Sequence, residues 1–121
     1  MKILLADDSS TMRLIQLHML KSFGYEDVVQ VDCGSDAISS LEQHPDVKLV
    51  LLDWNMPLVN GFECLRAIKA NEVTKNIPVI MVTSEANENR HAEAVQSGAA
   101  DYLVKPFYAE QLKSAIEAAV K

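Results

Sequence analysis

Short runs of hydrophobic residues alternate along the chain with longer stretches in which apolar and polar residues recur at helical spacing. The short runs are rich in Val, Ile and Leu and are too brief for helices, which is typical of strands. This alternation predicts five βα units around a parallel sheet that helices cover on both faces. The expected strands, all of them buried, lie at residues 3–6, 28–31, 49–52, 79–82 and 102–104.

Helical spacing predicts one helix after each strand. For the first helix, Ser9 or Ser10 can cap the N-terminus, and Gly24 follows the last turn, where glycine often ends a helix. The other helices are expected at residues 35–41, 62–70, 87–96 and 109–120. The buried face of the first helix is predicted to carry Met12, Ile15, Met19 and Phe23.

The succession of βα units also predicts the architecture. Five units with right-handed connections are too few to close an eight-stranded barrel, so we expect an open, doubly wound α/β sheet. Ligands bind to such sheets at the carboxyl ends of the strands. Residues 1–121 carry no linker, repeat or low-complexity tract and are expected to form a single domain.

Charge and composition narrow the classes of partner. The 121 residues contain 17 acidic and 11 Lys or Arg residues, with no basic cluster, so we expect no binding to nucleic acid. The N-terminus reaches two carboxylates before a signal-peptide core could form, and we expect neither export nor membrane insertion. Cys33 and Cys64 form no disulfide framework or metal motif, which favours a cytoplasmic protein.

Polar residues follow four of the five expected strands. Asp7 and Asp8 follow the first strand, Asp53 the third, Thr83 the fourth and Lys105 the fifth. Because the carboxyl ends of parallel strands meet at one edge, these side chains should share one pocket. Three close negative charges repel one another unless a cation joins them, and their oxygen ligands favour Mg2+ over softer metals. We therefore predict a magnesium site.

This set of residues suits phosphoryl transfer. A carboxylate can attack phosphorus to give an acyl phosphate, whose oxygens the metal, Lys105 and the Thr83 hydroxyl would stabilise. Asp53 is the best nucleophile because it is the isolated acid on a central strand. Taken singly, each residue also has an ordinary explanation as a helix cap, a strand-end hydroxyl or a surface charge. Their joint placement at four strand ends favours the functional interpretation.

The motifs DDSSTMR, LLDWNMP, MVTSEA and VKPF, together with Gly61, occur in the order in which receiver domains of two-component response regulators carry theirs. The chain resembles that family over its whole length, and DWNMP followed by TSEA resembles its motility branch. The resemblance implies a flavodoxin-like fold with strand order 2-1-3-4-5.

The resemblance also implies roles for individual residues. Asp53 would be phosphorylated by a histidine kinase. Asp8, Asp53 and the backbone carbonyl of Asn55 would bind Mg2+, and Asp7 would assist through water. Thr83 and Lys105 would hold the phosphoryl oxygens, with Tyr102 as the rotating aromatic of the switch. The Lys105–Pro106 peptide bond would be cis.

The function that this implies is a stand-alone, monomeric response regulator that catalyses only its own phosphorylation and dephosphorylation. Its output would be the face of the fourth helix, fifth strand and fifth helix, with the flagellar motor switch protein as the target and a phosphatase as a further partner. Two alternatives stay open. One is a phosphorelay intermediate. The other is a Mg2+-dependent phosphatase with an aspartyl nucleophile, although Asn55 stands where that class needs a second carboxylate.

Two further features are less specific. Trp54, beside Asp53, is either a lid over the metal site or a packing residue. The three histidines have no partner at metal-ligand spacing and are expected at the surface, at His18, His44 and His91.

Overall fold

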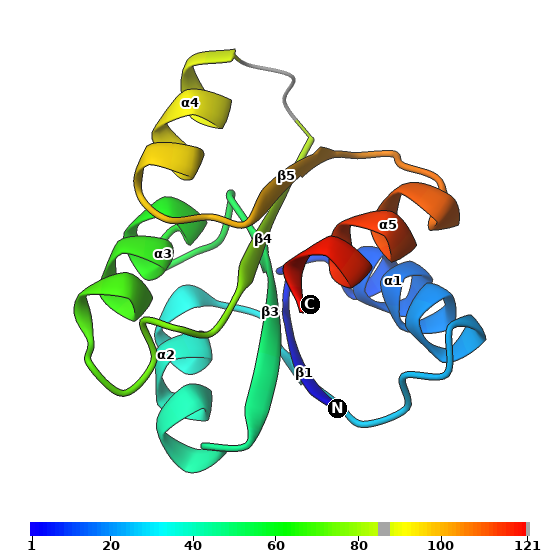
Figure 1. The fold of residues 1–121 in the computed structure, drawn as a ribbon, viewed down its shortest axis with the longest axis horizontal. Coiled ribbons are helices and arrows are strands. Elements are labelled where there is room, and N and C mark those ends of the chain that lie inside the picture. The colour runs from blue at the N-terminus through cyan, green and yellow to red at the C-terminus, as the bar shows by residue number, and fades with distance from the viewer. Residues whose placement is uncertain (85–87, 121) are drawn as a thin grey trace.

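The computed structural model describes residues 1–84 and 88–120, which form five strands and five helices in strict alternation (Figure 1). All strands are parallel, in the order β2-β1-β3-β4-β5, which confirms the predicted doubly wound sheet. The expected start of the fourth helix, at residue 87, lies outside the described residues. The strands are β1 Lys2–Ala6, β2 Val28–Val31, β3 Val47–Asp53, β4 Val79–Thr83 and β5 Asp101–Val104. The helices are α1 Ser10–Ser22, α2 Gly34–Gln43, α3 Gly61–Ala70, α4 Glu88–Gln96 and α5 Ala109–Ala119.

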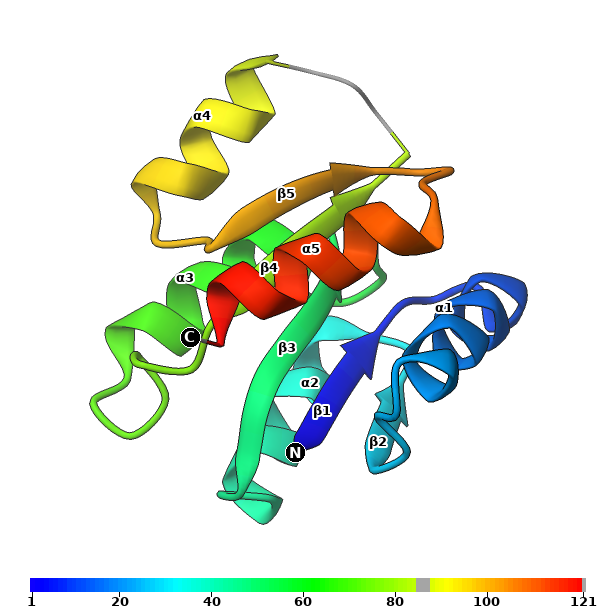
Figure 2. The same ribbon diagram turned by 45° about the vertical axis from the view of Figure 1, so that its right-hand side comes forward.

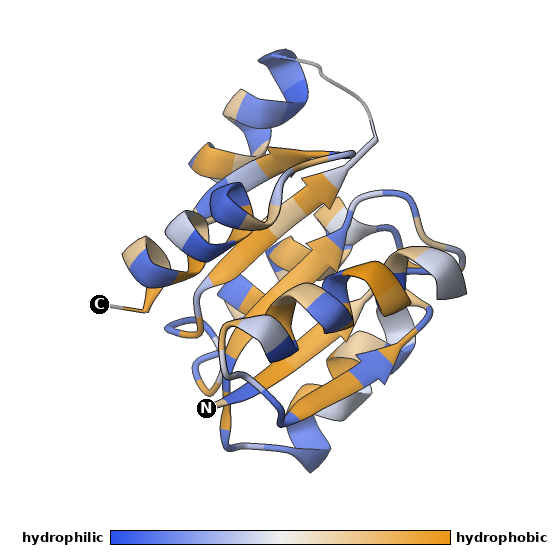
Figure 3. Ribbon diagram, turned by 90° about the vertical axis from the view of Figure 1, so that its right-hand side faces the viewer, coloured by the Kyte–Doolittle hydropathy of each residue, from blue (hydrophilic) through white to orange (hydrophobic). Residues whose placement is uncertain are grey.

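Helices cover the sheet on both faces, with α1 and α5 on one side and α2, α3 and α4 on the other (Figures 1 and 2). The central strand β3 serves both layers, because successive side chains of a strand point to opposite faces. Val50 and Leu52 pack with α2 and α3, whereas Leu49 and Leu51 pack with α1 and α5. Figure 3 shows hydrophobic strands between helices that carry both hydrophilic and hydrophobic residues.

The prediction that all five strands are buried is wrong for the two edges of the sheet. Every residue of β4 is buried, but in β2 the residues Val28, Val29 and Val31 are half-exposed and Gln30 is exposed. In β5 only Tyr102 is buried. An edge strand lacks a neighbour on one side, so apolar sequence alone does not distinguish it from a central strand.

The predicted buried face of α1 is also partly wrong. Ile15 is 42% exposed, whereas Gln16 and Leu20 are the buried residues of this helix. The helix is therefore rotated relative to its apolar stripe, and a polar amide faces the sheet. The ends agree with expectation: the Ser9 side chain accepts a hydrogen bond from the Met12 amide, and Gly24 has a φ of +94°.

Within residues 1–84 and 88–120, no helix has the length and apolar character needed to cross a membrane.

Two glycines, at the starts of α2 and α3, allow close packing at the carboxyl end of β3. A Cβ on Gly34 would lie 2.0 Å from the carbonyl oxygen of Val59, and a Cβ on Gly61 would lie 2.0 Å from the carbonyl oxygen of Asp53. Both helices thus begin in direct contact with the loop and backbone that follow β3.

Candidate functional site

The carboxyl ends of the strands bring the predicted polar residues together at one edge. Asp53 and Thr83 are the last residues of β3 and β4. Asp7 and Lys105 directly follow β1 and β5, and the Lys105 amide donates a hydrogen bond to the Thr83 carbonyl at 2.7 Å. The Lys105–Pro106 peptide bond is cis.

Three carboxylates form the centre of this edge. One oxygen from each of Asp7, Asp8 and Asp53 lies within 4.8 Å of the others. Asp7 is fully buried and Asp53 is 4% exposed, whereas Asp8 is open to solvent. Hard oxygen donors at this spacing, with one side accessible to water, fit a magnesium ion. Asn55 lies two residues beyond Asp53 and is exposed.

Lys105 is the cation that the structure itself supplies to these acids. Its ammonium nitrogen lies 2.7 Å from Oδ2 of Asp7 and 3.4 Å from Oδ1 of Asp53, and its side chain is only 11% exposed. A charge pair this close and this sheltered from water interacts more strongly than a surface pair. Lys105 therefore offsets part of the repulsion among the carboxylates.

The environment of Asp53 makes its carboxyl group harder to ionise. Burial raises its pKa from 3.8 to about 6, and the negative charge of Asp7 adds to the rise, while Lys105 acts in the opposite direction. At neutral pH most of the Asp53 population is still ionised. The ionised Asp53 carboxylate is therefore energetically unfavourable in the folded protein, and a bound cation would stabilise it.

This raised pKa predicts a pH-dependent gain in stability on replacing Asp53 with Asn. Since the folded pKa lies above the unfolded value, the contribution of protonated Asp53 is fully present below about pH 4 and is lost as the pH rises through about 6. In EDTA, Asp53→Asn should match the parent near pH 4 but unfold with a free energy about 1 to 3 kcal/mol higher at pH 7.5. Urea denaturation at both pH values measures the difference.

A second carboxylate provides the control for that prediction. Asp46 is exposed and pairs with Lys2 at 3.2 Å, and its hydrogen bond with Lys2 lowers its pKa. Asp46→Asn should therefore show no gain at pH 7.5. If Asp46→Asn gained as much unfolding free energy at pH 7.5 as Asp53→Asn, the gain would come from lowering the net negative charge of the protein and not from the environment of Asp53.

An aromatic cluster lies beside the acids, on the α3 and α4 side of the sheet. Tyr102 is 8% exposed, its ring stacked on His91 at 4.9 Å and edge-on to Trp54 at 6.4 Å. Trp54 is 6% exposed, stacks on Phe62 at 5.1 Å and has the Arg90 guanidinium 4.9 Å from its ring centre. Of the two interpretations left open for Trp54, the structure shows the packing residue.

Several contacts of the site were not predicted from the sequence. The Gln16 amide reaches Oδ2 of Asp7, and the Arg13 guanidinium donates to the Asp7 carbonyl at 2.6 Å. His91 was expected at the surface, and its residue is exposed, yet its ring covers Tyr102. No sequence pattern indicates such contacts, because they join segments that meet only in the folded chain.

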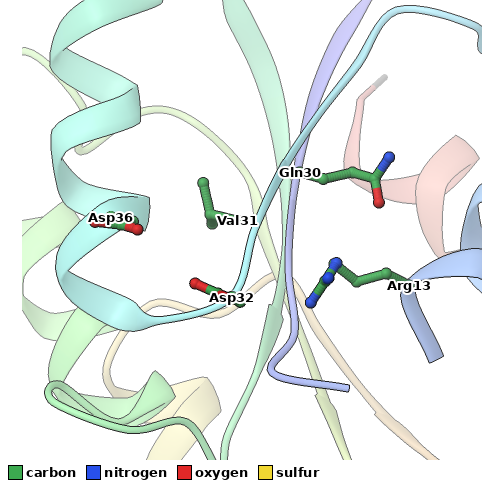
Figure 4. Close-up of a pocket in the computed structure, with 5 residues that line it drawn as sticks. All are labelled: Arg13, Gln30, Val31, Asp32 and Asp36. Atoms are coloured by element: carbon green, nitrogen blue, oxygen red, sulfur yellow. The ribbon is translucent and has the colours of Figure 1, made fainter. Parts of the chain in front are cut away.

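A hollow of about 410 Å³ is lined by residues of α1, β2 and α2 (Figure 4). Arg13 of α1 and Gln30 of β2 line one side, and Asp36 of α2 lies opposite. Arg13 connects this hollow with the acidic cluster, because it lines the hollow and also donates a hydrogen bond to the Asp7 carbonyl. Val31 and Asp32 complete the lining.

Comparison with known proteins agrees with this geometry. The model of the response regulator receiver domain matches residues 3–117. The chemotaxis protein CheY1 of Helicobacter pylori is 40% identical over 117 residues, covering 97% of this chain and 94% of that protein. Chemotaxis protein CheY4 of Vibrio cholerae superposes with a TM-score of 0.88 at 31% identity, covering 98% of this chain and 97% of the other.

A further similar structure is the receiver domain of a sensor histidine kinase from Pseudomonas aeruginosa, with a TM-score of 0.88 and 30% identity. The match covers 98% of this chain and 96% of that one, which was solved with a magnesium ion in its active site cleft. Sequence motifs, strand order and matched length thus agree, and the chain belongs to the response regulator receiver domain family.

Proposed function

We propose that this protein is a response regulator that accepts a phosphoryl group on Asp53, in a Mg2+-dependent reaction, from a phosphohistidine of a histidine kinase. The observation that carries the proposal is the Asp53 carboxylate, buried at the end of the central strand, 3.4 Å from Lys105 and beside two further carboxylates. An acid, a fixed cation and a metal-binding oxygen set are the components that aspartyl phosphorylation requires.

The metal ligands would be Asp8, Asp53 and the backbone carbonyl of Asn55, with Asp7 assisting through water. Mg2+ bound there would neutralise charge on the phosphoryl oxygens. Asp8 suits this role because it is the exposed member of the acidic cluster and leaves the metal accessible to an incoming phosphate. The magnesium described for the similar receiver domain of Pseudomonas aeruginosa supports the same choice of ion.

In the transfer step, a carboxylate oxygen of Asp53 attacks phosphorus. A bond from phosphorus to this oxygen forms as the bond from phosphorus to the histidine nitrogen breaks. Lys105 would bind one oxygen of the transferred group, and the Thr83 hydroxyl would donate a hydrogen bond to another. The protein would act only on itself, promoting its own phosphorylation and later hydrolysis of the acyl phosphate.

The output would be a change at the face formed by α4, β5 and α5. Tyr102 already packs inward between Trp54 and His91, so phosphate on Asp53 would fix this position by drawing Thr83 toward it. His91 of α4 would respond because its ring rests on Tyr102. Similarity to chemotaxis proteins supports the flagellar motor switch protein as the cytoplasmic target, with a phosphatase that ends the signal.

Labelling with a small phosphodonor tests the proposal directly. The protein, incubated with acetyl phosphate and Mg2+, should gain the mass of one phosphoryl group, and EDTA should prevent the gain. Proteolysis and mass mapping should place the group on the peptide that contains Asp53. Absence of uptake, or a stable phosphate on a hydroxyl side chain, would contradict the proposed function.

Replacing Thr83 should separate phosphorylation from output. Thr83→Ala removes a hydroxyl that is fully buried, and the phosphorylated form would lose a charge-assisted hydrogen bond. We expect labelling within about threefold of the parent, but affinity for the motor switch protein at least about tenfold weaker. Thr83→Ser, which keeps the hydroxyl, is the control and should bind as the parent does. Equal binding by all three phosphorylated proteins would refute the proposed switch.

A further inference from the structure

Gln16 is a polar side chain that α1 buries against the acidic cluster. It is 1% exposed and stands on the face of the helix that also buries Leu20. A buried amide is unfavourable unless its hydrogen bonds are satisfied, and an apolar residue would fill the same space without that cost. The amide therefore calls for an explanation beyond packing.

The orientation of the Gln16 amide follows from its neighbour. An ionised carboxylate can only accept hydrogen bonds, so Nε2 must face Asp7, whose Oδ2 lies 3.3 Å away. This orientation leaves Oε1 of Gln16 buried, and no atom of residues 1–84 and 88–120 donates a hydrogen bond to it. The side chain thus leaves one polar atom unsatisfied and makes one long hydrogen bond, to Asp7.

Within residues 1–84 and 88–120, three groups donate hydrogen bonds to the Asp7 carboxylate. The backbone amide of Ser9 lies 2.9 Å from Oδ1. Lys105 and Gln16 share Oδ2, and Lys105 is the closer at 2.7 Å. In the absence of phosphate, Lys105 therefore provides most of the hold on Oδ2, and Gln16 adds little.

Phosphorylation would change that balance. Lys105 also lies 3.4 Å from Asp53, and a phosphoryl group on Asp53 would draw the ammonium away from Asp7. Oδ2 of Asp7, fully buried, would then keep Gln16 as its one donor from the described part of the chain. A buried carboxylate oxygen without a donor is costly, so the side chain would turn away from the metal site.

We propose that Gln16 is a positioning residue that holds Oδ2 of Asp7 after Lys105 moves to the phosphoryl group, and so keeps Asp7 directed toward the metal during transfer. This inference rests on the proposed function. It gives a role to a residue of α1, which is not one of the polar residues at the ends of the strands. The long bond at 3.3 Å suits a donor that becomes important only when the shorter bond is released.

A double-mutant cycle on Mg2+ binding tests the inference without phosphorylation. Gln16→Met keeps the length of the side chain and removes the donor, and Lys105→Met imitates the departure of the ammonium. Titration followed by Trp54 fluorescence should show less than about a twofold change for Gln16→Met alone. In the Lys105→Met background, the same substitution should weaken Mg2+ binding about tenfold, the loss expected for a hydrogen bond to a buried charge. An equal effect in both backgrounds, or none in either, would overturn the proposal.

Labelling kinetics give a second measure should Lys105→Met fold poorly. At saturating Mg2+ and acetyl phosphate, Gln16→Met should label about tenfold more slowly than the parent, with an unchanged half-saturating Mg2+ concentration. Leu20→Met, one turn further along the same buried face, is the matched control and should behave as the parent. If the parent labels normally and Gln16→Met labels equally fast, the role of Gln16 is refuted and the proposed function stands. If the parent takes up no phosphate, the proposed function fails, while the Mg2+ cycle still decides the role of Gln16.

Discussion

Asp53→Asn is expected to abolish phosphoryl uptake from acetyl phosphate. The amide has nearly the shape of the carboxylate, so it should occupy the same space at the end of β3, but it has no anionic oxygen to attack phosphorus. Without that oxygen the acyl phosphate cannot form at this position, so no label should be detected. Intact-mass measurement after incubation with Mg2+ and donor gives the result.

Neither neighbouring acid is placed to substitute for Asp53. Asp7 accepts hydrogen bonds at both oxygens, from Ser9, Gln16 and Lys105. Asp8 is exposed to solvent and lies on the loop between β1 and α1. The matched control is Asp32→Asn, an exposed acid of the neighbouring hollow, which should label as the parent does. Undiminished labelling of Asp53→Asn would move the acceptor to another residue.

Gly61→Ala is expected to lower the free energy of unfolding by about 3 kcal/mol or more. A Cβ at this position would lie 2.0 Å from the carbonyl oxygen of Asp53 and 2.7 Å from Cα of Trp54. Both are backbone atoms, and the Gly61 amide is itself bonded to the Trp54 carbonyl at 2.7 Å, so the contact cannot be relieved by a side-chain rotation. The start of α3 would have to move away from β3.

Urea denaturation of Gly61→Ala and Gly24→Ala distinguishes the cost of a steric clash from the cost of a left-handed backbone conformation. Gly24 has a φ of +94°, and no described atom lies within 4 Å of a Cβ built there. Its substitution should therefore cost only about 1 kcal/mol, from the left-handed backbone. If the two variants lost equal stability, close contact at Gly61 would not be the cause. Trp54 emission would report whether the residue next to Asp53 has moved.

Most of the fold was predictable because its signals are local. A run such as residues 49–52 is buried on both sides of the sheet, so its hydrophobicity is continuous and marks a central strand. Asp7, Asp53 and Lys105 could be predicted to meet because the ends of parallel strands meet whatever the helices do. Strand order came from family motifs, since hydrophobic pattern does not say which strands are neighbours.

The remaining features depend on contacts between side chains of different elements. Ile15 has the side chain of a core residue, yet it is 42% exposed, and Gln16 takes the inward position beside Asp7. His91 and Tyr102 meet only after α4 has packed beside β5. Amphipathic pattern measures how apolar one face of a helix is, and it does not indicate that a single polar side chain will be buried in place of an apolar neighbour.

The ammonium group of Lys105, held between Asp7 and Asp53, has a consequence for how the site responds to ions. Because it is tethered to the chain, it competes for the carboxylates at a local concentration that dilution cannot lower. The ammonium stays beside the carboxylates when a divalent ion enters, and its positive charge repels that ion. This repulsion weakens the apparent affinity of the site for the ion. Half-occupancy would therefore require a higher free ion concentration than the three carboxylates alone would give, and a bound ion could leave more readily.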